Sequence, residues 1–235
     1  MLEKSFWHDY VSSALRTSWQ PAAFIPKKPP RLAPDENIID WCRVGQQNEA
    51  DSINLFQAAS CVATSEGWQI FAPLWLQDEM RHSEAFHRMG AYLGLPDRWV
   101  DSFIPSVEVV QMREKFYRCL FKSELHVWAA LAIDEWNTRR EYLEDGVADF
   151  EAYGLSKMMR LLSRDETRHH VFALKALQTH PDRQAAKAAV EDVVAIATTT
   201  DSFQQFLFDQ WDLNNAKRTP GNALDVIMQT LEKEV

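Results

Sequence analysis

Apolar side chains recur at helical spacing along most of the chain, and residues that break helices gather in a few short places. Those places are the Gly94–Pro96 segment, the stretch from Gly146 to Gly154, and His180-Pro181. Asp35 is placed to cap the first long helix. The pattern predicts long helices over about 36–65, 68–93, 105–145, 155–179 and 182–198, with shorter ones over 202–215 and 221–234. We therefore expect an all-α protein.

Residues 1–34 do not follow this pattern. The segment PAAFIPKKPPRLAP, at 21–34, is rich in Pro and basic residues, so we expect an extended arm rather than a helix. With 235 residues, the chain is long for one average domain and short for two. We predict a single domain, made of an extended Pro-rich arm over 1–34, a bundle over 36–180 and accessory helices over 181–235.

Composition narrows the classes of function. A formal net charge of -9 disfavours nucleic-acid binding through a broad basic surface. Cys42, Cys61 and Cys119 form no CxxC pair, which favours reduced, buried thiols in a reducing compartment over a rubredoxin-type iron site. The first residues show no secretory signal, and no stretch of about 18 apolar residues could span a bilayer. We expect a cytoplasmic protein without a membrane span.

A short internal repeat joins the second and fourth helices of the predicted bundle. QDEMRHSEAF at 77–86 and RDETRHHVFA at 164–173 both read Asp-Glu-x-Arg-His. Each copy places a Glu and a His three residues apart, on one face of a helix, where both can bind one metal ion: Glu79 with His82, and Glu166 with His169. A third such pair, Glu84 with His87, faces about 140° away from Glu79, so we expect it to be solvated.

A metal centre with two ions in a bundle needs one more Glu from each of the other two helices. Glu49 precedes Glu79 by 30 residues, and Glu135 precedes Glu166 by 31. Two antiparallel hairpins of nearly equal span would bring these four Glu to one level. Two divalent ions would balance the four carboxylates, and carboxylate ligands with one imidazole per ion suit iron or manganese better than structural zinc.

The Asp residues that precede the repeated Glu residues have two readings. A metal-bound His usually donates its other N–H to an acceptor. Asp78 and Asp165 could each accept from the His of the opposite repeat. Alternatively, each is a surface Asp paired with Arg81 or Arg168.

Further residues lie one or two turns from the predicted ligands. We expect these positions to line an apolar pocket, with core packing as the alternative: Ile53, Phe56, Trp75, Phe86, Trp128, Leu131, Met159 and Leu162. Thr138, one turn after Glu135, is predicted to act near bound oxygen, unless its hydroxyl bonds its own helix. Tyr142 is predicted to be a buried Tyr satisfied by a partner, and a redox relay is the alternative.

The six predicted ligands, in the order Glu49, Glu79-x-x-His82, Glu135 and Glu166-x-x-His169, resemble those of the ferritin-like di-iron-carboxylate superfamily. The resemblance covers about residues 36–180. Within it, the chain is most similar to the soluble acyl-carrier-protein desaturases: Glu135-Trp-Asn-Thr138 matches their third-helix Glu-x-x-Thr, and Asp165-Glu166-x-Arg168-His169 matches their fourth-helix motif. The resemblance implies a ferritin-like four-helix bundle with additional C-terminal helices. It also implies two Fe ions that cycle between Fe(II) and Fe(III), with Mn at one site as an alternative, and O2 as co-substrate.

The implied activity is that of a non-haem di-iron oxidase or oxygenase that desaturates, hydroxylates or otherwise oxidises an apolar or acyl-chain substrate. The alternatives are a fatty-aldehyde deformylating oxygenase, an iron-storage or detoxification ferroxidase, and a metal-free binding bundle. Because the chain carries no flavin or iron–sulfur motif, we expect a separate electron donor or reductase. The basic residues Lys27, Lys28 and Arg31 could contact an acidic carrier protein, and a homodimer is left open.

Overall fold

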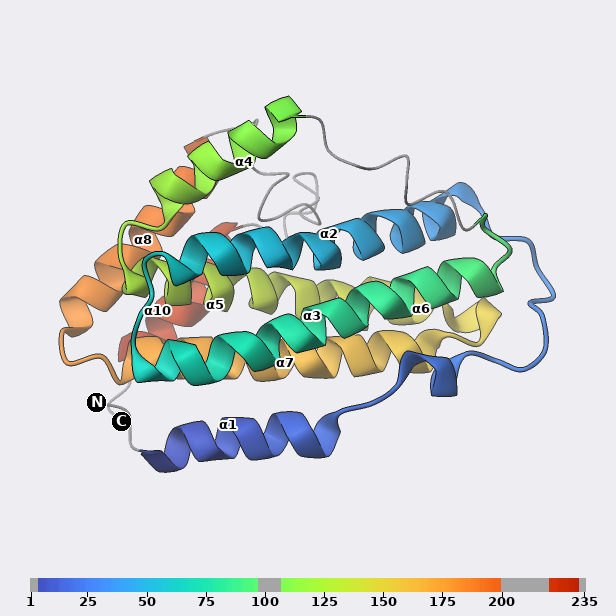
Figure 1. Ribbon diagram of the computed structural model, residues 1–235, viewed down its shortest axis with the longest axis horizontal. Coiled ribbons are helices and arrows are strands. Elements are labelled where there is room, and N and C mark those ends of the chain that lie inside the picture. The colour runs from blue at the N-terminus through green and yellow to red at the C-terminus, as the bar shows by residue number, and fades with distance from the viewer. Residues whose placement is uncertain (1–3, 97–106, 200–219, 233–235) are drawn as a thin grey trace.

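Figure 1 shows a computed structural model, which describes residues 4–96, 107–199 and 220–232. These residues form helices and connecting turns, and no strand occurs among them. The longer helices are α1 (Lys4–Thr17), α2 (Glu36–Ser60), α3 (Glu66–Tyr92), α4 (Val107–Leu120), α5 (Glu124–Glu141), α7 (Ser156–Gln178), α8 (Arg183–Thr199) and α10 (Pro220–Glu232). Short helical turns lie at η1 (Pro21–Phe24), η4 (Tyr142–Gly146), α6 (Val147–Asp149) and η5 (Glu151–Tyr153). The predicted helix over 202–215 lies outside the described residues.

Two helical hairpins form the body of the fold. Helix α2 packs along α3, helix α5 packs along α7, and α3 also contacts α7. The four helices lie roughly parallel to one another in Figure 1, with α1 alongside α3 and α7 and with α8 and α10 at one end. The predicted all-α bundle is therefore confirmed.

Helix boundaries follow local capping chemistry. The carboxylate of Asp35 accepts a hydrogen bond from the N–H of Ile38 at 3.0 Å, as predicted. Ser65 caps α3 in the same way, since its hydroxyl accepts from the N–H of Trp68 at 3.2 Å. Gly154 adopts a φ of +73°, a left-handed conformation that suits glycine and turns the chain into α7.

The predicted third helix, over 105–145, is wrong as a single element. Helix α4 ends at Leu120 and α5 begins at Glu124. Between them Ser123 is extended, with φ -158° and ψ 169°, and its hydroxyl lies 2.8 Å from Nδ1 of His126. Neither Gly nor Pro marks this break, so the helical spacing of apolar residues predicted one continuous helix. The far end also differs, because Tyr142–Gly146 forms a π-helical turn.

The predicted extended arm over 1–34 is also wrong in its first half. Lys4–Thr17 forms a helix, α1, whose Trp7 and Tyr10 are buried. The ring of Trp7 lies 5.9 Å from that of Trp128, and the ring of Tyr10 lies 4.9 Å from that of Phe71. Burial of these aromatic rings stabilises the helix. The Pro-rich segment that favoured an extended arm begins only at Pro21.

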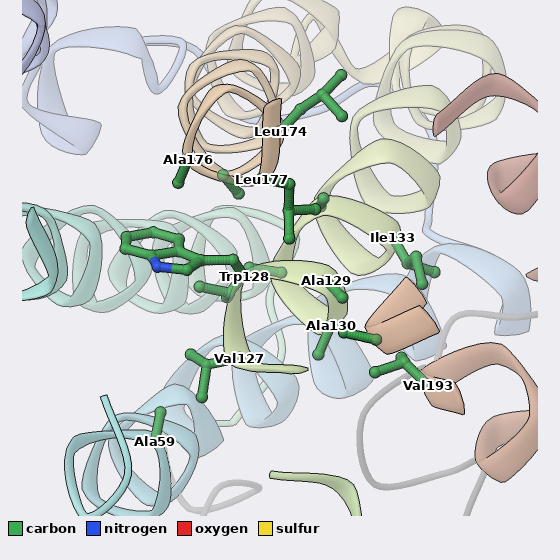
Figure 2. Close-up of a cluster of buried hydrophobic side chains, with 14 of the residues drawn as sticks. Ala59, Val127, Trp128, Ala129, Ala130, Ile133, Leu174, Ala176, Leu177 and Val193 are labelled. Carbon is green, nitrogen blue, oxygen red and sulfur yellow. The ribbon is translucent and has the colours of Figure 1, made fainter. Parts of the chain in front are cut away.

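The buried apolar residues form two clusters along the bundle. One gathers around α5, where this helix meets α7 and α8; Figure 2 shows Trp128, Ile133, Leu174, Leu177 and Val193 among its side chains. The other gathers around Phe86 and Tyr142. Along α3, α5 and α7, the predicted ligands lie between residues of the first cluster and residues of the second. The polar centre is thus enclosed by apolar packing on both sides.

The cysteines differ in part from the expectation. All three are free thiols, but only Cys42 is buried, and Cys61 and Cys119 are exposed. Burial raises the pKa of the Cys42 thiol to about 12, so this thiol stays protonated.

Within the described ranges, no helix is both long enough and apolar enough to cross a bilayer.

Candidate metal centre

The six predicted ligands meet in the middle of the bundle. They come from all four long helices: Glu49 from α2, Glu79 and His82 from α3, Glu135 from α5, and Glu166 and His169 from α7. They fall into two groups of four, one with Glu49 and His82 and one with Glu135 and His169, and both groups share Glu79 and Glu166. Within each group, one ligand atom per residue lies within 4.8 Å of the others. All six residues are at most 5% exposed.

Each His points its Nδ1 atom at carboxylates of both hairpins. Nδ1 of His82 lies 2.8 Å from Oε1 of Glu166 and 3.5 Å from Oε2 of Glu49. Nδ1 of His169 lies 3.1 Å from Oε1 of Glu79 and 3.3 Å from Oε2 of Glu135. The nearly equal spans of the two hairpins thus bring the two repeats together in a pseudo-symmetric arrangement.

The electrostatics of the centre are those of crowded, buried acids. Burial raises the pKa values of Glu79 and Glu135 well above 4.5, and the nearby Glu166 carboxylate raises both further. Glu49 differs: burial acts to raise its pKa, but its contact with His82 overcomes this and lowers it. Burial acts to lower the pKa of His82, yet Glu166 and its other acidic neighbours raise it well above 6.5. Without cations, protons must therefore neutralise part of the charge.

The two Asp residues of the repeat stand behind the opposite histidines. Oδ2 of Asp78 lies 3.2 Å from Nε2 of His169, and Oδ2 of Asp165 lies 3.5 Å from Nε2 of His82. This is the crossed arrangement that the repeat predicted. The alternative of two surface Asp residues is wrong, because Asp78 is 2% exposed and Asp165 is 0% exposed.

The arginines of the repeat also bind these aspartates. Each Asp therefore lies behind the opposite His and also pairs with Arg, so both predicted contacts occur together. Arg81 lies 2.6 Å from Asp78 and 3.3 Å from Asp165. Arg168 lies 3.0 Å from Asp165 and also pairs with Asp78. Burial would raise the pKa of Asp78, but the contacts with His169 and Arg168 lower it to about 2. The four charges form a closed ring that joins α3 to α7.

Two aromatic side chains hold carboxylates of the centre. The indole Nε1 of Trp75 donates to Oε1 of Glu135 at 2.8 Å. The hydroxyl of Tyr142 donates to Oε1 of Glu49, so Tyr142 is a buried Tyr with a partner, as predicted. Trp75 was predicted as pocket lining only, since the pattern of apolar positions cannot show where an indole N–H points.

Most of the predicted pocket residues are packed in the core. Phe86, Leu131, Met159 and Leu162 are at most 2% exposed, and Trp128 is 4% exposed. Phe56 is half-buried. Ile53 is wrong as a pocket residue, because it is 45% exposed although it follows Glu49 by about one helical turn.

The remaining predicted residues differ in their exposure. Thr138 is half-buried one turn after Glu135, and no hydrogen bond to its hydroxyl occurs among the described residues. Glu84 is exposed and pairs with Arg88 at 2.7 Å, in line with its predicted solvation. Lys27, Lys28 and Arg31 are exposed.

A cavity of about 670 Å³ opens where α1 meets the ends of three bundle helices. Its walls are largely apolar and include Trp7, Val11, Ile70, Leu125 and Trp128. The ring of Trp128 lies 5.1 Å from that of Phe71, which in turn lies 6.4 Å from the imidazole of His169. The rings of Trp128 and Phe71 thus lie in sequence between this cavity and His169.

Comparison with known proteins shows the fold. Neither a protein-family model nor a curated protein matches the sequence. The structure resembles that of an R2-like ligand-binding oxidase from Sulfolobus acidocaldarius, with a TM-score of 0.57 and 18% sequence identity over 97% of this chain and 90% of that one. This likeness does not confirm the desaturase branch. The chain therefore has the ferritin-like helical fold that it shares with this R2-like oxidase.

Proposed function

We propose that the chain is an oxygen-dependent di-iron oxidase or oxygenase. The observation that carries this proposal is the buried set of four carboxylates and two imidazoles whose ligand atoms converge on one centre. Oε1 of Glu166 faces Nδ1 of His82 at 2.8 Å, and Oε1 of Glu79 faces Nδ1 of His169 at 3.1 Å. Buried polar atoms normally have partners, and two divalent cations would satisfy these atoms and balance the four negative charges.

The donor set fits iron. Glu49, Glu79, His82 and Glu166 would hold one ion, and Glu79, Glu135, Glu166 and His169 the other, with Glu79 and Glu166 shared between them. Such oxygen-rich ligation with one imidazole per ion suits iron, with manganese at one site as the alternative. When bound, two Fe(II) ions would supply the electrons that reduce O2.

The surrounding side chains orient the ligands and set their charges. Asp78 and Asp165 lie nearest the Nε2 atoms of the opposite histidines, so with cations bound each imidazole would keep its proton on Nε2 and offer its Nδ1 lone pair to the centre. Arg81 and Arg168 keep both aspartates ionised. The apolar clusters on either side exclude water, which strengthens every charge interaction inside.

The proposed substrate is an apolar molecule or an acyl chain. The cavity beside Trp128 supports this, because its walls are mostly apolar and its volume suits a small molecule. We also propose a separate reductase as electron donor. Carrier-protein delivery through Lys27, Lys28 and Arg31 is a further proposal, supported by their exposure on an acidic chain.

Oxygen consumption by protein loaded with Fe(II) tests the proposed function. With medium-chain fatty acids or aldehydes and a chemical reductant, wild-type protein should consume O2 and release an oxidised organic product. Glu166→Ala should abolish both. Glu84→Ala should match wild type, since Glu84 is exposed and pairs with Arg88. O2 consumption that yields only Fe(III), in particles of many subunits by light scattering, would instead establish a storage ferroxidase.

A further inference from the structure

The cavity of about 670 Å³ at the end of the bundle has an apolar floor. Trp7, Gly67, Trp128 and Ala176 line the cavity and are buried. A Cβ atom at Gly67 would clash with Cζ2 of Trp7, so glycine is what lets α1 approach α3 this closely. The floor therefore contains two indole rings, 5.9 Å apart, that present apolar surface to a bound molecule.

The carboxylate of Glu124 is held in place at one side of this cavity. Its Oε2 atom accepts hydrogen bonds from the N–H groups of Thr64 and Ser65, at 3.1 Å and 3.2 Å. Its Oε1 atom accepts from the Ser65 hydroxyl and, at 3.2 Å, from the indole Nε1 of Trp128. All four donors are neutral, so the negative charge of Glu124 remains beside the cavity. Because the indole N–H is used in this bond, Trp128 offers a ligand only its apolar ring.

The rim of the cavity is polar and acidic. His8 and Glu66 line it and are exposed, and His180 lines it half-buried. Within the described ranges, Glu66 forms no ion pair. Neither Lys nor Arg occurs among the described residues that line the cavity. The carboxylates of Glu66 and Glu124 are therefore not neutralised by any cation of the cavity wall.

A polar rim above an apolar floor fits an amphipathic molecule, and charge decides which head group it carries. A carboxylate head would lie beside two other carboxylates with no Lys or Arg to neutralise it, which is unfavourable. An ammonium head would be attracted by both carboxylates and would donate hydrogen bonds to Glu66. The imidazoles of His8 and His180, in their neutral form, can also accept hydrogen bonds from it.

We propose that this cavity binds an amphipathic organic cation, whose ammonium head lies at the rim beside Glu66 and whose apolar body covers Trp7 and Trp128. The inference deepens the proposed function, and it rests on that function only for the role of this molecule as a substrate. The apolar end then lies against Trp128, on the side of the cavity nearer His169, and the amine lies away from the metal centre. An uncharged head binds less tightly, and a carboxylate head least tightly.

Three ligands with the same chain and different heads test this assignment: octylammonium, 1-octanol and octanoate. Isothermal titration calorimetry with the whole chain, treated with chelator and kept at pH 8 and low salt, gives each Kd without any step that depends on metal. Octylammonium should bind about five-fold more tightly than 1-octanol, a factor that corresponds to about 1 kcal/mol, the upper range for an exposed ion pair. Octanoate should bind more weakly than 1-octanol, because its head is repelled.

Two variants with matched controls locate the site. Glu66→Gln should weaken octylammonium binding about three-fold and leave 1-octanol binding unchanged. Glu36→Gln is its control, since Glu36 is an exposed glutamate in the first turn of α2 and the net charge changes equally. Leu125→Trp, which fills the cavity, should abolish binding of both ligands. Val62→Trp, which fills a separate cavity between α2 and α4, should leave both Kd values unchanged.

The remaining outcomes would overturn the inference. Equal Kd values for octylammonium and 1-octanol would remove the cationic head, and tighter binding of octanoate would show that the rim imidazoles recognise an anion. Far-UV circular dichroism checks the fold of each variant, and Val11→Trp on α1 replaces Leu125→Trp if the latter does not fold. Octylammonium binding that survives in a folded, cavity-filled variant would place the ligand elsewhere on the acidic surface.

Failure of the inference and failure of the proposed function give different results. Protein that binds two Fe(II) ions but no octylammonium would remove this inference alone. Protein that binds octylammonium in the cavity but no Fe(II) would remove the proposed function alone.

Discussion

Asp165→Ala should cost the metal-free protein far more stability than one hydrogen bond contributes. Asp165 is 0% exposed and contacts the Trp19 indole at 2.7 Å, Arg168 at 3.0 Å and Arg81 at 3.3 Å. The side chains of Arg81 and Arg168 are only 10% and 6% exposed, so neither can turn fully into water. Removing one partner of a buried ion pair costs about 3–5 kcal/mol, whereas a net hydrogen bond contributes about 1 kcal/mol.

Urea unfolding of chelator-treated protein, followed by far-UV circular dichroism, measures this cost. Asp192→Ala is the matched control, because Asp192 pairs with Lys122 at 2.6 Å on the surface, where a salt bridge contributes at most about 1 kcal/mol. Asp165→Ala should also weaken metal binding on the His82 side about 10–100-fold, and Asp78→Ala should do so on the His169 side. Equal stability losses for Asp165→Ala and Asp192→Ala would refute the buried ring of charges.

Three further predictions follow from the centre and the arm. Metal-free protein should lose stability as pH rises above about 4.5, because the raised pKa values of Glu79 and Glu135 stabilise the fold only while these groups are protonated; urea midpoints from pH 5 to 8 measure this, and a midpoint that rises with pH would contradict it. Trp75→Phe should weaken binding on the Glu135 side about five-fold by Co(II) titration, since it removes one hydrogen bond; an unchanged affinity would count against that role. Charge reversal at Lys27, Lys28 and Arg31 should weaken affinity for an acidic carrier, and unchanged turnover and carrier affinity would remove that idea.

The bundle and the six clustered residues could be predicted because both depend on local spacing. A Glu and a His three residues apart share a helix face whatever surrounds the helix. The repeat then identified the second pair, and the nearly equal spans from Glu49 to Glu79 and from Glu135 to Glu166 identified the remaining Glu residues. Asp78 and Asp165 followed from the same pseudo-symmetry.

The features that the sequence did not reveal depend on tertiary contacts. Helix α1 is stabilised by aromatic burial against Phe71 and Trp128, which no pattern within residues 1–34 shows. The break before α5 has no Gly or Pro. The Trp19–Asp165 bond joins residues 146 apart in sequence, so only the fold brings them together. Ile53 shows the opposite error, since helical spacing alone placed an exposed residue in the pocket.

Anaerobic Fe(II) titration with quantified iron tests the central claim most directly. Wild-type protein should bind two Fe(II) ions per chain, because two groups of four ligands are present. Glu49→Ala should impair only one half, whereas Glu79→Ala and Glu166→Ala should impair both, since these residues are shared. Glu84→Ala should still bind two. Binding of no iron by wild type, or of two tightly held ions by both Glu79→Ala and Glu166→Ala, would contradict the proposed di-iron centre.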